Sequence, residues 1–226
     1  MTRHGSLITL KPEYEERYII LHKHTFPGVL YQIRKSNIQN YTIFLRDFLQ
    51  EKMLFSYFEY TGDDFKADMT NMAEDPTTQE WWKLTDPMQE PLETHKEGER
   101  WSSIEEIFHT GAIKKPSGEA QRHASVVDLR PEFQEEYRKL HAEVSPVVLE
   151  QIQESNIQNY SIFLHEYRLY SYFEYIGDNF KEDMDEMFCD SKTFKWWDIC
   201  KTLQKKIPTA GEDEWWAEMK EVFHTD

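Results

Sequence analysis

Two tyrosine–histidine pairs, Tyr18 with His22 and Tyr137 with His141, have the spacing of neighbours on a helix. Residues four apart lie on the same face of an α-helix, so each phenol is predicted to lie beside an imidazole. Histidine suits general acid–base catalysis because its ordinary pKa, about 6.5, lets it take and give protons near neutral pH. The same spacing also fits a buried histidine that only makes a structural hydrogen bond. The pairs are therefore candidate proton-transfer groups.

Adjacent tryptophans occur at equivalent positions of the two halves, as Trp81-Trp82 and as Trp196-Trp197. Successive residues of a helix point about 100° apart, so both indoles of a pair cannot fill one core position. We expect one indole of each pair to line a cleft, where its flat face can stack on a sugar ring and its N–H can donate a hydrogen bond. Packing in the core is the alternative.

Tyr41, matched by Tyr160, lies in a segment that has the composition of a strand. Side chains alternate between the two faces of a strand, which places Tyr41 with Ile43 on one face and Asn40 with Ile38 on the other. Tyr41 and Tyr160 are candidate sugar contacts, although a tyrosine in a strand usually belongs to the core.

Glu59 and Glu174 each interrupt an apolar, strand-like run. A carboxyl group there is a candidate second proton carrier. Two other interpretations are open: exposure on a sheet edge, or pairing with Arg3 and Arg122.

Three histidines recur in each half of the chain, which raises the question of a metal site. They are expected on separate elements without ligand-pair spacing, and the two cysteines, Cys189 and Cys200, do not make a four-ligand zinc pattern. No glycine-rich phosphate loop is present. The sequence therefore predicts neither metal nor cofactor. The histidines are His4, His22 and His109, matched by His123, His141 and His224.

Almost the whole chain is a tandem repeat. The segment SNIQNYTIFL at 36–45 returns as SNIQNYSIFL at 155–164, and SYFEYTGDDFKADM at 56–69 returns as SYFEYIGDNFKEDM at 171–184. The offset falls from 119 to 115 residues between these blocks, which predicts a hairpin loop that is shorter in the second copy. We predict two units, residues 1–110 and 122–226, joined by a Gly-, Pro- and Ser-containing linker at 111–121.

Each copy has the pattern strand, helix, two strands, helix, strand. In the second copy, apolar residues from Phe133 to Val148 recur every three or four positions and predict one amphipathic helix. Pro27 is expected to kink its equivalent in the first copy. The order is typical of the ferredoxin-like split βαβ unit, whose sheet carries helices on one face only. We therefore expect an α+β protein whose two ferredoxin-like units (βαββαβ) form an internal pseudo-dimer of the dimeric α/β-barrel type.

The composition excludes several classes of partner. Lys and Arg number 26 against 42 Asp and Glu, so the formal charge is −16. A surface this acidic repels nucleic acids and anionic membranes, and no apolar run reaches the length of a membrane helix. The first residues lack the apolar core of a secretory signal. We expect a cytoplasmic protein that binds a small molecule.

The motifs resemble those of the L-rhamnose mutarotase family over nearly all of both copies. The resemblance rests on YxxxH followed by Phe26-Pro27, on NYxIFL, on the LFSYFE strand, on QEWWKLTDPM and on the terminal EEIF. Members of that family are single ferredoxin-like units that pair as homodimers, and they interconvert the anomers of L-rhamnose without metal or cofactor. The resemblance thus implies a sugar mutarotase acting on L-rhamnose or a related deoxyhexose.

Carried over by position, the resemblance implies that His22 and His141 donate a proton to the ring oxygen. The implied sugar-binding positions are Tyr18, Tyr41, Trp81 and Trp82 in the first copy and Tyr137, Tyr160, Trp196 and Trp197 in the second. The family commonly has Trp before the first-helix Pro, where this chain has Phe26 and Ser145. If that aromatic residue walls the pocket, the second site is wider.

Two other functions are weighed against this one. The first is a sugar-binding or scaffold module without catalysis. The second is an oxygenase of the dimeric-barrel type, which rests on analogy of fold alone.

Overall fold

The computed structural model describes residues 1–111 and 120–226. They divide into two compact units, the first made of Met1–Ile104 with Lys220–Asp226 and the second of Glu105–Met219. The predicted linker at 111–121 falls mostly outside the described residues. Residues 111, 120 and 121 of this segment are described, and Gln121 begins a strand.

The first unit combines helices with an antiparallel sheet. Its helices are α1 (Glu15–Lys23), α2 (Pro27–Lys35), α3 (Phe65–Glu74) and α4 (Pro76–Thr85), with the 3₁₀ turns η1 (Pro12–Tyr14) and η2 (Asp86–Met88). Its strands are β1 (Thr2–Leu10), β2 (Ile38–Asp47), β3 (Lys52–Tyr60) and β4 (Gln89–Glu90), with parts of β5 (Ser102–Thr110) and β10 (Ala217–Thr225).

The second unit repeats this order. Its helices are α5 (Gln134–Ala142), α6 (Pro146–Glu154), α7 (Phe180–Cys189) and α8 (Ser191–Leu203), with the 3₁₀ turn η3 (Pro131–Phe133). Its strands are β6 (Gln121–Leu129), β7 (Ile157–His165), β8 (Arg168–Tyr175) and β9 (Gln204–Lys205), with the remaining parts of β5 and β10. No helix of the described ranges is long and apolar enough to cross a lipid bilayer.

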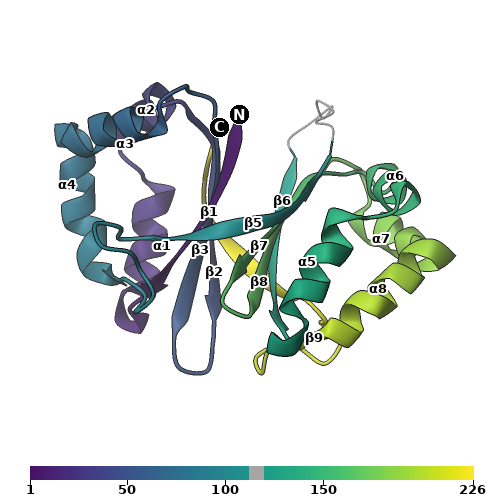
Figure 1. The fold of residues 1–226 in the computed structure, drawn as a ribbon. Coiled ribbons are helices and arrows are strands. Elements are labelled where there is room, and N and C mark those ends of the chain that lie inside the picture. The colour runs from purple at the N-terminus through teal and green to yellow at the C-terminus, as the bar shows by residue number, and fades with distance from the viewer. Residues whose placement is uncertain (112–119) are drawn as a thin grey trace. The chain divides into compact units, whose positions relative to one another are not determined.

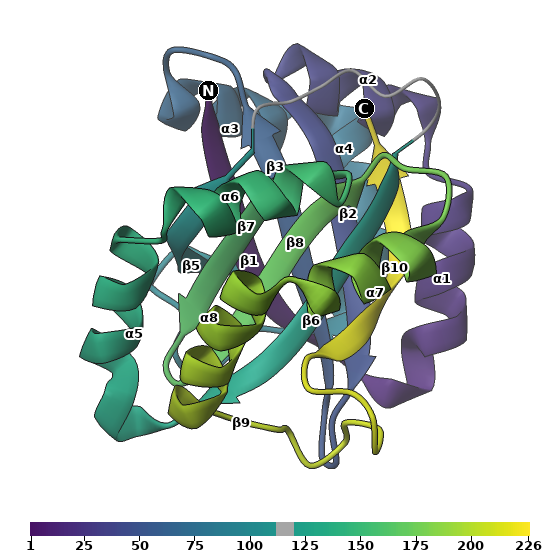
Figure 2. The same cartoon turned by 90° about the vertical axis from the view of Figure 1, so that its right-hand side faces the viewer.

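The strands β5 and β10 each belong to the sheets of both units. In the first unit, β1 lies between β3 and the start of β5, and β2 lies between β3 and the end of β10. In the second unit, β6 lies between β8 and the start of β10, and β7 lies between β8 and the end of β5. Within each unit the helices cover one face of the sheet (Figures 1 and 2). The predicted mixture of helix and sheet is confirmed.

The single helix predicted from Phe133 to Val148 is wrong, because two helices occupy this stretch. A proline begins the second helix, at Pro27 in the first unit and at Pro146 in the second. The residue before a proline is forced out of the helical region, and Phe26 and Ser145 accordingly have ψ angles of 130° and 134°. The apolar period continues across this break, so it could not reveal it.

The predicted hairpins are confirmed, including their difference in length. The loop between β2 and β3 covers residues 48–51, and the loop between β7 and β8 covers residues 166–167. The ladder of the first hairpin also begins one residue further out on each strand, at Asp47 opposite Lys52. Its counterpart begins at His165 opposite Arg168. Loop and strands together account for the four extra residues.

A β-bulge interrupts the alternation along β2, with a register shift between Gln39 and Thr42. Asn40, inside the bulge, has a φ of 50°, in the left-handed region that asparagine tolerates better than most residues. Ile38 consequently joins the same buried cluster as Ile43. The prediction that these two isoleucines lie on opposite faces is wrong, because the bulge adds one residue between them.

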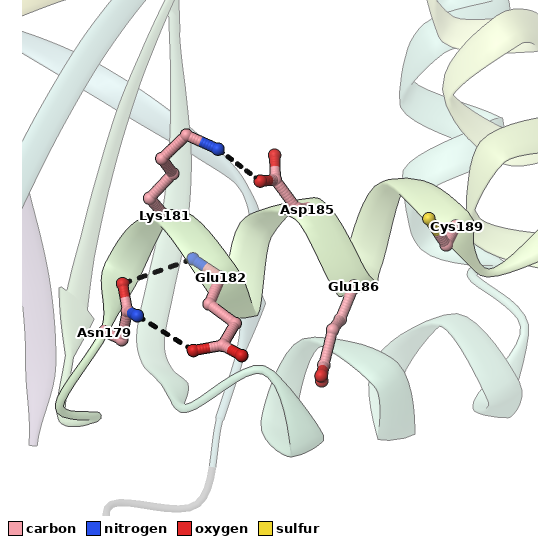
Figure 3. Close-up of a pocket in the computed structure, with 6 residues that line it drawn as sticks. All are labelled: Asn179, Lys181, Glu182, Asp185, Glu186 and Cys189. Atoms are coloured by element: carbon pink, nitrogen blue, oxygen red, sulfur yellow. Dashed lines mark hydrogen bonds and ion pairs between the residues drawn. The ribbon is translucent and has the colours of Figure 1, made fainter.

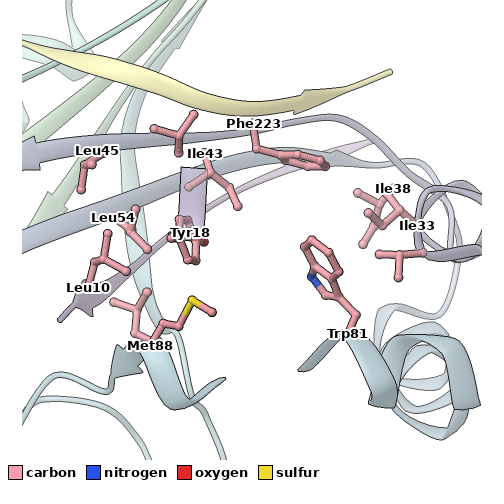
Figure 4. Close-up of a cluster of buried hydrophobic side chains, with 13 residues drawn as sticks. Leu10, Tyr18, Ile33, Ile38, Ile43, Leu45, Leu54, Trp81, Met88 and Phe223 are labelled. Carbon is pink, nitrogen blue, oxygen red and sulfur yellow. The ribbon is translucent and has the colours of Figure 1, made fainter. Parts of the chain in front are cut away.

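The core of the first unit fills the space between its helices and its sheet. Figure 4 shows Trp81 of α4 and Phe223 of β10 in this cluster together with Tyr18 of α1. Tyr18, Trp81 and Tyr41, three of the aromatic candidates of the first unit, therefore pack between the helix layer and the sheet.

Candidate functional site

Each predicted histidine is buried near the end of a short helix, His22 in α1 and His141 in α5, both 8% exposed. The Nδ1 atom of His22 lies 2.9 Å from the backbone oxygen of Tyr18, and that of His141 lies 3.0 Å from the oxygen of Tyr137. A carbonyl oxygen can only accept, so Nδ1 carries the hydrogen in both rings. In a neutral ring, Nε2 then holds the lone pair. Among the described residues, neither Nε2 atom has a hydrogen-bond partner.

Burial decides the charge of these rings. It lowers the pKa of His22 to about 4 and the pKa of His141 to about 4, while the hydrogen bond to the backbone oxygen acts in the opposite direction. Both imidazoles are therefore neutral at pH 7. A neutral ring with a protonated Nδ1 is a proton acceptor at Nε2 first, and a donor only after it has accepted.

The predicted neighbours on the helix, Tyr18 and Tyr137, lie against the imidazoles, with ring centroids 4.0 Å apart in both pairs. Gln89 Nε2 donates to the phenol oxygen of Tyr18 at 3.1 Å, and Gln204 does the same for Tyr137 at 3.2 Å. Burial raises the pKa of both tyrosines well above 10, so both keep their protons.

The two glutamines that donate to these phenols were not among the residues predicted from the sequence. A signal was present, because Gln89 and Gln204 keep the offset of 115 residues that relates the two repeats. Each follows its tryptophan pair by a fixed distance and lies in a two-residue strand, β4 or β9.

A phenylalanine from a strand remote in sequence completes each cluster. In the first unit the ring of Phe223, in β10, lies 5.5 Å from the rings of both His22 and Tyr41. In the second unit Phe108, in β5, lies 5.4 Å from His141 and 5.6 Å from Tyr160. Sequence analysis could not assign these contacts, because each phenylalanine belongs to the other sequence repeat.

Tyr41 and Tyr160 face the same side of the sheet as this cluster. Burial raises the pKa of Tyr41 to about 12, and it also raises the pKa of Tyr160. Both phenols therefore remain hydrogen-bond donors throughout the physiological range of pH.

One indole of each tryptophan pair contacts the imidazole. The ring of Trp81 is 5.2 Å from His22, and the ring of Trp196 is 5.5 Å from His141. Trp82 is 37% exposed, and Trp197 lies 4.6 Å from Phe188 of α7. The sugar-binding role of these two remaining indoles stays a prediction.

The two clusters differ beside the indole. Phe26 lies 5.3 Å from Trp81, edge to face, and Trp81 is buried at 6% exposure. Ser145 occupies the equivalent position in the second unit, where Trp196 is half-buried. Less of the second indole is covered by protein.

Glu59 and Glu174 lie on strands inside the sheet and are 2% and 8% exposed, so exposure at a sheet edge is wrong. Arg3 and Arg122 are their directly opposite partners on the neighbouring strands, β1 and β6. Each carboxyl group accepts hydrogen bonds from three side chains of its own unit. These hydrogen bonds hold neighbouring strands together, and the role of a second proton carrier stays a prediction.

A family model described as L-rhamnose mutarotase matches the chain twice, over residues 3–110 and 122–225. The chain belongs to the L-rhamnose mutarotase family. The resemblance seen in the sequence is thereby confirmed, and the family places the chain among the isomerases.

Individual mutarotases match one half of this chain. The L-rhamnose mutarotase of Oceanobacillus iheyensis is 29% identical over 110 residues, which cover 48% of this chain and 98% of that protein. That of Listeria monocytogenes serovar 1/2a is 32% identical over 104 residues, which cover 46% of this chain and 97% of that protein. Two matches of the family model in one chain indicate a tandem duplication of the mutarotase unit.

A solved structure resembles the whole chain. It is a monooxygenase-like protein from Fusobacterium nucleatum, 10% identical, with a TM-score of 0.60 over 99% of this chain and 93% of that one. At this identity the likeness concerns the fold alone.

The histidines of this mutarotase-family chain that lie outside the two clusters have other partners. The ring of His4 stacks on Phe58 at 4.9 Å and on Phe65 at 4.5 Å, and His224 shares a hydrogen bond of 2.9 Å with Thr42. Within residues 1–111 and 120–226, no three His, Cys, Asp or Glu side chains form a group that could hold a metal ion.

Two surface hollows lie away from the predicted residues of the mutarotase site. One, of about 510 Å³, runs along α7 and is lined by residues between Asn179 and Cys189 (Figure 3). Three of its charged side chains are engaged, since Lys181 pairs with Asp185 and Asn179 donates to Glu182. The other, of about 370 Å³, is lined by polar residues of α2 and α3 and by Asp75. None of the predicted site residues lines either hollow.

Proposed function

We propose that this chain is a sugar mutarotase that interconverts the α and β anomers of L-rhamnose or a related deoxyhexose, with one site in each unit. The observation that carries the proposal is the state of the two imidazoles. Each is buried and neutral, its Nδ1–H is bound to a backbone oxygen, and its Nε2 is left to exchange protons. The family assignment supports the type of reaction.

The reaction needs one proton to move between two oxygens bonded to the same carbon. Opening the pyranose removes the proton of the anomeric hydroxyl, breaks the bond between C1 and the ring oxygen, and places a proton on the ring oxygen. We infer that Nε2 of His22 or His141 takes the first proton and returns it to the ring oxygen. Closure on the other face of the aldehyde, by the reverse steps, gives the other anomer.

This order of proton transfers refines the role that the family resemblance implies for the histidine. A neutral imidazole whose hydrogen is on Nδ1 carries no proton on Nε2, so donation from Nε2 to the ring oxygen follows acceptance from the hydroxyl. The net proton count of the enzyme is unchanged after each turnover, and no redox change occurs.

The tyrosines and indoles are proposed to hold the sugar. Tyr18 and Tyr41, with Tyr137 and Tyr160 in the second unit, are protonated phenols that can donate to sugar hydroxyls. Trp81 and Trp196 lie beside the imidazoles, and an indole face can stack on the apolar side of a deoxy sugar. We propose Trp82 and Trp197 as further contacts at the rim.

We further propose that residues 1–110 and 122–226 are two ferredoxin-like units that form an internal pseudo-dimer of the dimeric α/β-barrel type. The strand orders β5-β1-β3-β2 and β10-β6-β8-β7 support this, because they are the order of a split βαβ unit. From the acidic composition we also propose a cytoplasmic enzyme whose partner is a monosaccharide.

A sugar-binding module without catalysis is the competing function. An oxygenase is a lesser alternative, favoured only by the likeness of fold to the monooxygenase-like protein. Thermal stabilisation by L-rhamnose without faster anomer exchange would indicate the binding module. Oxidation of an added phenolic substrate with consumption of O₂ would indicate the oxygenase.

The test follows anomer exchange of L-rhamnose by saturation-transfer NMR. We expect the wild-type chain to accelerate exchange and the double variant His22→Gln/His141→Gln to lose about 10²-fold or more of that acceleration. His24→Gln is the matched control, because His24 is exposed just beyond the end of α1. Full activity in the double variant would remove histidine from the mechanism.

A further inference from the structure

A left-handed asparagine occurs at the same place in both units. Asn40 in β2 and Asn159 in β7 each have a φ of 50°, within a β-bulge at the same register. A non-glycine residue in this region is uncommon, and its neighbours must hold it there. The bulge and its left-handed asparagine are therefore common to both units.

The bulge decides which way Tyr41 faces. Ile38 and Tyr41 are three residues apart, so regular alternation would place them on opposite faces of β2. Both nevertheless pack in the cluster beneath the helices, where Tyr41 lies against Phe223. Two residues three positions apart can face the same side of a strand only if one extra residue is inserted between them, and the bulge supplies that residue.

Glu59 holds the bulge from the other face of the sheet. Phe58, its neighbour on β3, packs on the helix side, so Glu59 points to the opposite side. One carboxyl oxygen accepts from Asn40 Nδ2 at 3.1 Å and from the Tyr57 hydroxyl at 3.1 Å, and the other accepts from Gln39 Nε2 at 3.0 Å.

The second unit has the same arrangement. Glu174 accepts from Asn159 Nδ2 at 2.7 Å, from Gln158 Nε2 at 2.8 Å and from the Tyr172 hydroxyl at 3.1 Å. Tyr160, the residue after the asparagine, contacts Phe108 of the site cluster. A buried carboxyl group with three donors is a firm anchor for the side chains that it binds.

We propose that Glu59 and Glu174 are positioning residues for the sugar site: each fixes its asparagine in the left-handed conformation and thereby turns Tyr41 or Tyr160 toward the imidazole. The inference rests on the proposed mutarotase function. The carboxyl groups act through the bulge and lie on the face of the sheet opposite the cluster.

The first unit is tested alone in the His141→Gln background. We expect Glu59→Gln, which keeps the shape but turns an NH₂ group toward the amide donors, to raise KM for L-rhamnose about fivefold to tenfold, with a smaller change in kcat. Glu13→Gln is the matched control, because Glu13 is exposed in η1 and far in sequence from the bulge.

Adding Asn40→Gly separates positioning from direct catalysis. Glycine adopts positive φ without a partner, so Glu59→Gln/Asn40→Gly should recover most of the lost KM. A carboxyl group that moved protons itself could not be replaced in this way, so a failure of glycine to restore KM while the fold is intact would overturn the proposal.

A readout independent of activity keeps the two proposals distinguishable. The nuclear Overhauser contact between the Tyr41 and Phe223 rings should weaken in Glu59→Gln and return in the glycine double variant. An unchanged contact in Glu59→Gln would overturn the positioning role. If the wild type did not accelerate anomer exchange, the proposed function would fail, and the ring contact would still decide whether Glu59 positions Tyr41.

Discussion

The tyrosine–histidine pairs proposed as the reactive groups are closely alike in the two units, while the residues beside the neighbouring indoles differ. The tyrosine–histidine ring distance is 4.0 Å in both units, and the bonds from the imidazole to the helix backbone differ by only 0.1 Å. The indole next to His22 is buried under Phe26, and the indole next to His141 is half-buried beside Ser145. Proton transfer tolerates little displacement, whereas a wall can change with the size of the sugar that it must admit.

The glutamines under the tyrosines show the same contrast. Both donate to a phenol, yet in the second unit Trp215 Nε1 also donates to Gln204 Oε1 at 2.7 Å. Arg100 is the residue at that position of the first unit, and its guanidinium binds backbone oxygens, including that of Gln89. The glutamine that donates to the phenol is thus bound by a tryptophan in the second unit and by an arginine in the first.

Replacing one histidine at a time should have the largest effect on the rate of anomer exchange. His22→Gln and His141→Gln each leave one proposed site, and we expect each variant to lose the share of exchange carried by its own site, with His22→Gln losing more L-rhamnose exchange because its site is walled by Phe26. Saturation-transfer NMR measures both. Equal losses would contradict a difference between the walls.

Truncation of the buried indoles should separate the units by stability. We expect Trp81→Ala to lower the free energy of unfolding by about 3 kcal/mol, and Trp196→Ala by about 1–2 kcal/mol, because less of Trp196 is covered. Urea denaturation followed by circular dichroism gives both values. A larger loss for Trp196→Ala would show that its surroundings are tighter than those of Trp81.

Acidification should act equally on both units. Each histidine has a pKa of about 4 when folded and about 6.5 when unfolded, so the unfolded chain binds more protons and stability falls as pH falls from 6.5 toward 4. The loss should reach about 2 kcal/mol per histidine at pH 5. It is measured as the difference between wild type and each His→Gln variant in denaturation at pH 7 and pH 5. If the two variants differed from the wild type by unequal amounts of stability, the two imidazoles would not have equivalent surroundings.

Substitutions at Phe26 and Ser145, the residues beside the indoles, should have the smallest effect on activity. In His141→Gln, we expect Phe26→Ser to raise KM for L-rhamnose, and in His22→Gln, Ser145→Phe to lower it. Each change should be about tenfold or less, since an aromatic contact contributes about 1 kcal/mol. Concentration dependence of the exchange rate gives KM. If neither substitution alters KM, this position does not contact the sugar.

Much of the fold could be predicted because its signals are local. Residues four apart on a helix must be neighbours, which is why Tyr18 and His22 were placed together correctly. Two apolar runs joined by a short polar segment must turn back on each other, which predicted both hairpins. The break at Pro146 was missed because the apolar period runs through it.

The gaps in the predicted site have a common cause. Phe223 and His22 are about 200 residues apart in the chain and meet only because the end of β10 pairs with β2. The carboxyl group of Glu59 was considered for chemistry, and its actual partners depend on a bulge that alternation does not anticipate. Contacts between strands depend on register, and register is set by the whole sheet.

The repeat, the order of the main strands and the tyrosine–histidine pairs could be derived from the amino-acid sequence, because these follow from identity and short-range spacing along one chain. The packing of distant segments makes the imidazoles neutral, brings one indole of each pair into contact with them, and places Tyr41 on the helix side of the sheet. Burial and strand register exist only once distant segments have packed together, and they set the charge and direction of every group in the site.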